Sequence, residues 1–213
     1  MGQKTILLIT DGIGFNASDK FNAFANAKKP AYDYLFKNAP NTLLHTSGLA
    51  VGLPQGQMGN SEVGHMTIGS GRILYQNLVK IDRAIDEGLL EKNEALQSLL
   101  SKCRRVHVIG LYSDGGVHSH LRHFDAICEI AQNASRETWA HAITDGRDVS
   151  PSSGAEFLKH LQAKFKVASV CGRFYAMDRD KRFDRVKRAY DVLIGEAAPL
   201  EISPSEYILQ SYE

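Results

Sequence analysis

The feature of this chain that most restricts its fold is a repeated local unit. Each unit holds a short run of β-forming residues, a turn with Asp or Gly, and an amphipathic stretch of helical spacing. Three successive units predict strands at residues 105–111, 138–144 and 167–171. Strands that alternate with helices of about 10–15 residues favour a parallel sheet whose faces are covered by helices. The predicted fold class is therefore α/β, a parallel sheet layered with helices.

The remaining pattern is less regular. It predicts a buried strand at residues 5–10 and a weaker strand at 42–46. Residues 48–71 are predicted to form a glycine-rich loop that contains a short helix. Helices are predicted at 30–38, 78–89, 91–102, 119–132, 151–164 and 181–194. The tail at 197–213 is polar and shows no closing element. We place a boundary near residues 72–77, which gives domains at 1–73 and 74–213.

Charge and composition exclude several classes of protein. The net charge of +1 gives no bulk electrostatic attraction to nucleic acid or membranes, and no platform of interleaved aromatic and basic residues is seen. The apolar run at residues 6–9 is too short for a signal peptide or a membrane span. Cys103, Cys128 and Cys171 form no CxxC pair, which favours reduced thiols and a soluble cytoplasmic protein.

Polar residues follow the predicted strands at the edge where parallel sheets bind ligands. They are Asp11, Asp114, Asp145, Arg147, Asp148 and Arg173. Turn chemistry explains an Asp at such a place, but it does not require Arg at two of them. Asp11, directly after the first predicted strand, is suited to a hard divalent cation, or is simply a turn residue.

Ser61 lies in the densest polar segment, residues 56–65. If a helix begins near Asn60, the hydroxyl of Ser61 lies at its N-terminus, where backbone N–H groups stabilise phosphate. The hydroxyl is a weak nucleophile until a base or metal deprotonates it. The strong local bases are Glu62 and His65, so the sequence favours a metal as activator; the alternative is that Ser61 only caps the helix.

Three histidines and a basic run are further candidates. His118, His120 and His123 could bind zinc, contact an anion or pack structurally. In the basic run, Arg182, Arg185, Lys187 and Arg188 read as a solvated helix face. Arg173 and Arg179 differ because they lie in the loop that follows a strand, where Arg can grip phosphate or carboxylate through two hydrogen bonds.

Taken together, these segments resemble the cofactor-independent phosphoglycerate mutases of the alkaline phosphatase superfamily. The resemblance runs from about residue 6 to 208. It rests on the Asp11–Gly12 strand end and on the motifs at residues 58–65, 113–120, 145–149 and 172–180. It implies a phosphatase-like domain that holds two Mn²⁺ ions, with an inserted transferase domain. Residues 1–73 then correspond to the N-terminal part of the first domain, and 74–213 to most of the second, incomplete at its C-terminus.

The resemblance also implies roles for individual residues. Ser61 matches the nucleophile that carries the phosphoryl group, and Asp11 and Ser61 match ligands of one metal ion. The residues that match the substrate-binding set are His118, Arg147, Asp148, Arg173 and Arg179. The implied reaction interconverts 3-phosphoglycerate and 2-phosphoglycerate without 2,3-bisphosphoglycerate. Its partner is a small-molecule substrate, and complete family members are expected to be monomers.

One departure from the family is large, since its members are more than twice as long as this chain. The other metal ligands lie downstream in those members, so we expect the 213-residue chain alone to be inactive. We also expect residues 1–72 to be less stable than 74–196, because most of their sheet is missing.

Two alternatives stay open: a non-catalytic binder of small phosphorylated acids, and another metal-dependent phosphatase or phosphomutase of the superfamily. Ile13 stands where a haloacid-dehalogenase-like phosphatase needs Asp, which excludes that class.

Overall fold

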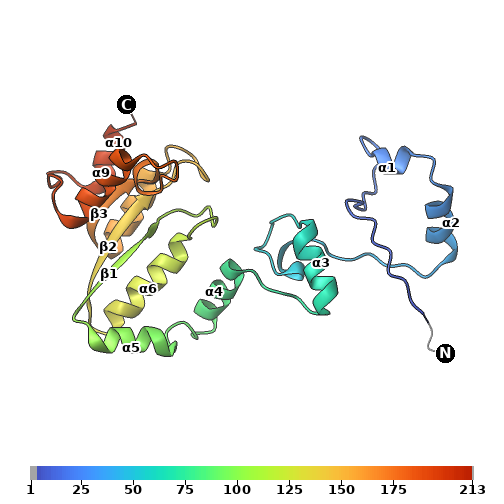
Figure 1. The fold of residues 1–213 in the computed structure, drawn as a ribbon, viewed down its shortest axis with the longest axis horizontal. Helices are drawn as coiled ribbons and strands as arrows, with labels where there is room; N and C mark the ends of the chain where they lie inside the picture. The colour runs from blue at the N-terminus through green and yellow to red at the C-terminus, as the bar shows by residue number, and fades with distance from the viewer. Residues whose placement is uncertain (1–3, 213) are drawn as a thin grey trace. The chain divides into compact units, whose positions relative to one another are not determined.

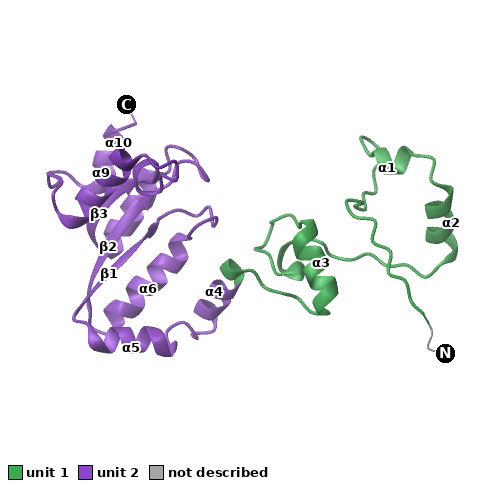
Figure 2. Cartoon of the chain, viewed as in Figure 1, with its two compact units in different colours: residues 1–79 green, residues 80–213 purple. Residues whose placement is uncertain are grey.

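The structure is a computed structural model that describes residues 4–212. It divides the chain into two compact units, residues 1–79 and 80–213 (Figure 2). Each unit is described by itself. In the described part of the chain, no helix has both the length and the apolar character that crossing a membrane requires.

The second unit is built on a parallel sheet of three strands in the order β1–β2–β3 (Figure 1). The strands are β1 (Arg105–Leu111), β2 (Glu137–Thr144) and β3 (Lys166–Gly172). Both pairs run parallel, with one irregularity in the register opposite Ala140 and His141. The α/β class, the parallel sheet and all three strands of this unit are confirmed within about one residue at each end.

Helices precede, join and follow these strands. They are α4 (Asn77–Asp86), α5 (Glu94–Lys102), α6 (Leu121–Asn133), α7 (Gly154–Lys164), α8 (Arg173–Ala176), α9 (Phe183–Ile194) and α10 (Pro204–Gln210). The α6 helix lies along β1 and β2 (Figure 1). The α7 helix contacts both β3 and α10. The side chains between sheet and helices form the main core, which includes Ala140, Ala142, Phe124, Leu158 and Leu161. Burial of every second residue in β2 is the pattern of a strand with one face on this core.

The tail corrects one expectation, since it was predicted to hold no closing element. Residues 204–210 form α10, and Ser203 and Glu206 close its N-terminus as a reciprocal capping box. Ile208 then packs against the core. The capping signature is present in the sequence, but it precedes a helix of only two turns in a polar segment.

All three cysteines are free thiols, as predicted. Cys128 is fully buried in the core, and burial raises the pKa of its thiol to about 12. Burial also raises the pKa of Cys171. Both shifts favour the protonated, unreactive form at neutral pH.

The first unit holds α1 (Ala23–Asn26), α2 (Pro30–Asn38), the 3₁₀ helix η1 (Gly48–Val51) and α3 (Ser61–Ser70). The helix at 30–38 is confirmed, and the helix inside 48–71 is longer than expected. The strands expected at 5–10 and 42–46 are wrong for this structure, since neither segment is assigned as strand. Ile6 and Leu8 are 91% and 82% exposed. A strand needs a hydrogen-bonded neighbour, and the apolar pattern alone does not supply one.

A small second core fixes the segment before α3. Val51, Leu53 and Val63 are its buried members. Gly59 passes so close to the preceding loop that an added Cβ would lie 1.8 Å from the carbonyl oxygen of Thr46. Only glycine fits there, so the glycine-rich character of this region serves close backbone packing just ahead of Ser61.

Candidate functional site

The carboxyl ends of the three strands bring polar side chains from three loops together. Ser113 comes shortly after β1, Asp145 directly follows β2, and Arg173 directly follows β3. The hydroxyl of Ser113 donates to Asp145 Oδ2 at 2.8 Å. Nη1 of Arg173 donates to Asp145 Oδ1 at 2.6 Å and to Asp148 Oδ2 at 2.6 Å. The parallel topology therefore gathers this cluster, as the strand-end pattern predicted.

The guanidinium of Arg173 has one edge that can still bind a ligand. The two hydrogens of its Nη1 account for both carboxylates. For Nε and Nη2, no partner is found in the part of the chain that the structure describes. That edge is the one with which a guanidinium holds a carboxylate or phosphate side-on through two hydrogen bonds. The side chain is only 11% exposed, so the edge is fixed and largely shielded from water.

Asp145 is the most buried carboxylate of this cluster. Its burial opposes ionisation, but the backbone N–H of Asp148, the Arg173 guanidinium and the Ser113 hydroxyl together lower its pKa from 3.8 to about 2. Asp145 is thus a carboxylate at all physiological pH values. Sequence reasoning noted it as a strand-end residue but did not include it, or Ser113, among the site residues. The sequence signal that could have identified Asp145 is its position directly after the strand β2.

The lowered pKa of Asp145 predicts an acid-dependent stability difference. A carboxyl with a depressed folded-state pKa stabilises the fold above its unfolded pKa, and this stabilisation is lost as the pH falls toward 2. The quantity to compare is the difference in free energy of unfolding between the wild type and Asp145→Asn. We expect this difference to be about 2 kcal/mol smaller at pH 2 than at pH 5. Urea unfolding at both pH values measures this. The exposed neighbour variant Asp114→Asn serves as control; a difference for Asp145→Asn that is the same at both pH values would contradict the prediction.

The other substrate-binding candidates, His118, Arg147 and Arg179, have freer side chains. His118 Nε2 is 3.8 Å from Asp148 Oδ2, and its side chain is 47% exposed. Arg147 and Arg179 are exposed, and no hydrogen bond or ion pair of their guanidinium groups is found among residues 4–212. Cations without protein partners at the ligand edge of a sheet are suited to an anionic ligand.

The three histidines of residues 118–123 do not act together. His120 caps α6 by accepting from the N–H of Arg122, and burial lowers its pKa. His123 pairs with Asp82 at 3.0 Å. In the described residues, no group of three or more His, Cys, Asp or Glu side chains could hold a metal ion. Structural roles therefore account for two of the three histidines, and His118 alone lies beside the cluster.

Arg185 corrects a second expectation, because it was assigned to a solvated helix face. Its guanidinium lies over the ring of Phe174, 3.8 Å from the centroid, and 3.5 Å from Asp178 Oδ1. The Asp178 side chain is only 2% exposed. This pairing ties α9 to the loop that carries Arg179, and a charge count along the sequence does not show it.

Ser61 is the first residue of α3, and the side chain of Asn60 caps that helix by accepting from the N–H of Val63. His65 Nδ1 lies 3.2 Å from Ser61 Oγ and 2.7 Å from the Ser61 carbonyl oxygen. A carbonyl oxygen only accepts, so Nδ1 carries the proton and donates. The same nitrogen therefore has no lone pair with which to deprotonate the hydroxyl. This arrangement excludes His65 Nδ1 as the base for Ser61.

Asp11 meets Ser61 in the first unit. A hydrogen bond from the Ser61 side chain is the main cause that lowers the pKa of the Asp11 carboxyl. A carboxylate and a hydroxyl side by side are oxygen donors of the kind that Mn²⁺ and Mg²⁺ prefer. The two residues fit part of the coordination of such an ion, and no group of three or more His, Cys, Asp or Glu side chains that could complete a metal site is found among the described residues.

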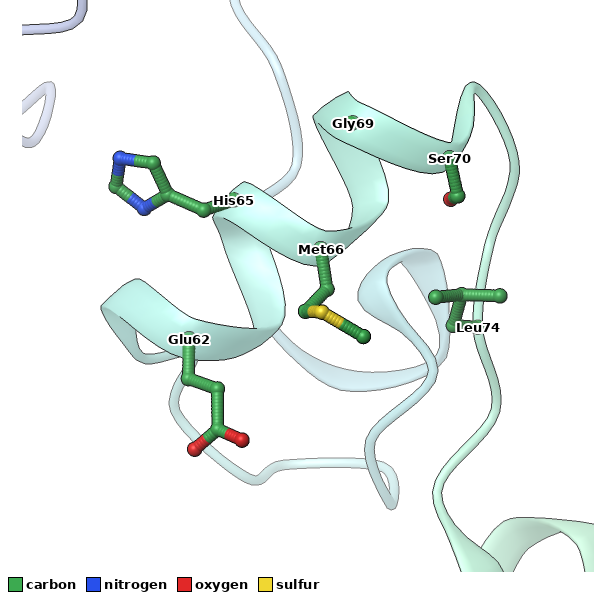
Figure 3. Close-up of a pocket in the computed structure, with 6 residues that line it drawn as sticks. All are labelled: Glu62, His65, Met66, Gly69, Ser70 and Leu74. Carbon is green, nitrogen blue, oxygen red and sulfur yellow. The ribbon is translucent and has the colours of Figure 1, made fainter.

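The α3 helix also borders an open hollow of about 480 Å³. Figure 3 shows Met66 and Leu74 beside it, with Glu62 and His65 projecting from α3 in different directions. The residues that line it are Glu62, His65, Met66, Gly69, Ser70 and Leu74. Ser61 and Asp11 are not part of its lining, whereas His65, which contacts Ser61, is.

The parallel sheet with its layer of helices makes the chain an α/β protein. The sequence profile described as BPG-independent PGAM N-terminus matches residues 81–213. The chain therefore belongs to the family of BPG-independent phosphoglycerate mutases, whose N-terminal region that profile describes.

Named relatives agree with this placement. The chain is 62% identical to the 2,3-bisphosphoglycerate-independent phosphoglycerate mutase of Campylobacter jejuni strain RM1221, over all of this chain and 44% of the relative. It is 54% identical to the enzyme of that name from Sulfurimonas denitrificans, with the same coverage. A crystal structure of Leishmania mexicana phosphoglycerate mutase at low cobalt concentration superimposes with a TM-score of 0.63 at 32% identity. That match covers 87% of this chain and 37% of the other. The chain thus spans less than half the length of its relatives.

Proposed function

We propose that this chain carries the nucleophile segment and most of the substrate-binding part of a metal-dependent enzyme that interconverts 3-phosphoglycerate and 2-phosphoglycerate in glycolysis and gluconeogenesis. The observation that carries the proposal is the 62% and 54% identity with relatives that bear the name of that mutase; the effect of Ser61 on the pKa of Asp11 supports it. The proposal keeps residues 1–73 as part of a phosphatase-like domain and 74–213 as part of a transferase domain. It places the enzyme in the cytoplasm as a monomer.

Asp11 and Ser61 would be the ligands that this chain gives to a Mn²⁺ site. When bound, such an ion supplies charge neutralisation for the phosphate and lowers the pKa of the serine hydroxyl. Ser61 at the N-terminus of α3 adds backbone N–H groups and the positive end of the helix dipole. Since His65 Nδ1 is already a donor, the helix terminus and the oxygen ligands are the local features that favour an alkoxide at Ser61.

The substrate-binding residues divide the remaining work. Arg173 offers its free edge to the phosphate or carboxylate of the substrate. Arg147 and Arg179 supply cations for which the described residues offer no partner, and His118 and Asp148 are suited to the hydroxyl groups of the glycerate. Phosphoryl transfer depends mainly on positioning and charge neutralisation, which fixed arginines provide.

In the proposed reaction, the oxygen of Ser61 attacks phosphorus and the bond from phosphorus to the glycerate oxygen breaks. The Ser61 hydroxyl loses its proton in this step, the glycerate oxygen takes one up, and a phosphoserine results. The glycerate then turns while the arginines hold it. Its other hydroxyl loses a proton and attacks the phosphorus, the bond from phosphorus to Ser61 breaks, and the Ser61 oxygen is protonated again. No free 2,3-bisphosphoglycerate takes part, in keeping with the names of the relatives.

The test uses the natural gene product, whose intact mass is measured first. The protein is incubated with 3-phosphoglycerate and Mn²⁺. We expect 2-phosphoglycerate to form and phosphate to appear on the peptide that contains Ser61. Ser61→Ala should abolish both, whereas Ser70→Ala, at the other end of the same helix, should retain both. Formation of free phosphate and glycerate without the isomer would instead favour a phosphatase of the superfamily.

For the purified 213-residue chain, we expect no turnover with Mn²⁺, because one carboxylate and the nucleophile cannot hold a two-metal site. Measurable formation of 2-phosphoglycerate by this chain would contradict that expectation. Arg147 and Arg179, which are exposed and have no ion-pair partner within residues 4–212, favour a second candidate function for the chain alone, the binding of small phosphorylated acids. Calorimetry with 3-phosphoglycerate tests it, with loss of binding expected in Arg179→Ala. A natural product of 23.5 kDa would make this second function the leading one.

A further inference from the structure

We propose that Asp145 is a positioning residue of the substrate site, a buried carboxylate that fixes the Arg173 guanidinium and the backbone of the Arg147–Asp148 loop. This proposal rests on the proposed function, since it names what holds the substrate-binding arginines in place.

The hydrogen bonds of Asp145 join the loops after all three strands. Its Oδ1 accepts from the backbone N–H of Arg147 at 3.1 Å, from that of Asp148 at 3.0 Å and from Arg173 Nη1 at 2.6 Å. Its Oδ2 accepts from the Ser113 hydroxyl at 2.8 Å. Three of the five substrate-binding candidates are thus tied to one carboxylate.

Burial separates this role from substrate binding. The Asp145 side chain is 1% exposed, and Ser113 is fully buried. A ligand at the edge of the sheet cannot reach a carboxylate that is covered in this way and already accepts four hydrogen bonds. Asp145 therefore acts through its neighbours, above all through Arg173, which is held at 11% exposure.

The charge of Asp145 decides which edge of Arg173 is left free. Asp145 and Asp148 each accept one hydrogen bond from Nη1. These two bonds fix the orientation of the guanidinium, and with it the direction in which the edge formed by Nε and Nη2 points. Without the charge of Asp145, a neutral oxygen in its place would hold Nη1 more weakly, Asp148 would be the one charged partner left to Nη1, and the guanidinium could rotate more freely. A hydrogen bond between two charged groups is stronger than one between neutral groups, which is how a long side chain is kept in one orientation.

Asp145→Asn is the sharpest variant because it has the same shape. The amide oxygen can still accept from the N–H groups of Arg147 and Asp148, and the amide NH₂ can donate to the Ser113 hydroxyl, which also accepts. What is lost is the negative charge opposite Arg173. The matched control is Asp125→Asn, a second buried carboxylate of the same unit that bonds Tyr112, His160 and Lys164 and has no contact with Arg173.

The experiment combines calorimetry with 3-phosphoglycerate and NMR of the Arg173 side-chain N–H groups, on the 213-residue chain. In Asp145→Asn, we expect the affinity to fall roughly tenfold to a hundredfold. The separate Arg173 signals should average, as rotation of the guanidinium is released. Asp125→Asn should lower the thermal midpoint but leave both readouts unchanged. If Asp145→Asn fails to fold, Ser113→Ala removes one bond to the same carboxylate, and we expect a smaller loss, about threefold.

A double variant shows whether Asp145 acts through Arg173. In an Arg173→Ala background, the change Asp145→Asn should cause little further loss of affinity, because the group that it positions is gone. An equal loss in both backgrounds, or unchanged Arg173 signals in Asp145→Asn, would overturn the proposal. If the wild-type chain does not bind 3-phosphoglycerate, the substrate assignment of this site fails, and the NMR signals alone then decide whether Asp145 fixes Arg173.

Discussion

The backbone amides of residues 6–9 are expected to exchange with deuterium roughly a thousand times faster than those of the central strand β2. In the structure, residues 6–9 form neither helix nor strand, and Ile6, Leu7 and Leu8 are 71–91% exposed. In β2, Ala140 and Ala142 are almost fully buried, and strands pair with it on both sides.

The physical reason is the difference between local and global opening. An exposed amide with no hydrogen-bond partner exchanges at close to its intrinsic rate. An amide in the middle of a sheet exchanges only when the surrounding unit opens, which costs several kcal/mol in a stable domain. Each 1.4 kcal/mol is a factor of ten, so a modest stability of the second unit gives the expected ratio.

Hydrogen exchange followed by mass spectrometry or NMR on the purified chain measures this difference. The amides of α3 provide a control within the first unit, because they are hydrogen-bonded and rest on the small core of Val51, Leu53 and Val63. We expect α3 to exchange at an intermediate rate. Protection of residues 6–9 equal to that of residues 106–109 in β1 would count against the expectation that the first 72 residues are the less stable part.

The same contrast explains how much of the fold the sequence could predict. For β1, β2 and β3, the local pattern and the partner agree, because each strand is followed by a turn and a helix that return the chain to the same sheet. For residues 5–10, the local pattern is equally strong, but no partner strand lies in the described residues. Local sequence predicts which segment can form a strand; pairing decides whether it does.

The site shows a similar division. The positions of Asp145, Asp148 and Arg173 at strand ends can be predicted from the sequence, because parallel topology fixes where strand ends meet. Which of these side chains is buried cannot be predicted in the same way, since burial depends on how three loops close over the sheet. Asp145 was therefore noted but not assigned a role. The proton on His65 Nδ1 is a still finer point, because it follows from a 2.7 Å contact with a carbonyl oxygen that no spacing rule predicts.

Asp125→Ala is expected to lower the free energy of unfolding of the second unit by about 3–5 kcal/mol. The Asp125 carboxylate lies 8% exposed between α6 and α7. It accepts from the Tyr112 hydroxyl at 2.7 Å, from His160 Nε2 at 3.0 Å when that nitrogen carries a proton, and from Lys164 Nζ at 3.1 Å. Burial and the neighbouring Asp125 raise the pKa of Tyr112 well above its usual range, so the hydroxyl stays a donor.

The loss has two physical sources. Tyr112 is only 1% exposed, so its hydroxyl would be left buried without an acceptor, which costs about 1–3 kcal/mol. Lys164 and His160 are more exposed and can turn to water, so they contribute less. Removal of the carboxylate also leaves a cavity between α6 and α7 at the edge of the main core.

Denaturant unfolding of the two variants Asp125→Ala and Glu129→Ala gives a matched comparison. Glu129 lies 3.7 Å from the same Lys164 but is 55% exposed, so its loss is expected to cost less than about 1 kcal/mol. Tyr112→Phe in the Asp125→Ala background should then recover part of the lost stability, because it removes the orphaned hydroxyl. A change of less than 1 kcal/mol for Asp125→Ala, or no recovery in the double variant, would show that the bond between Tyr112 and Asp125 does not hold α6 against the sheet.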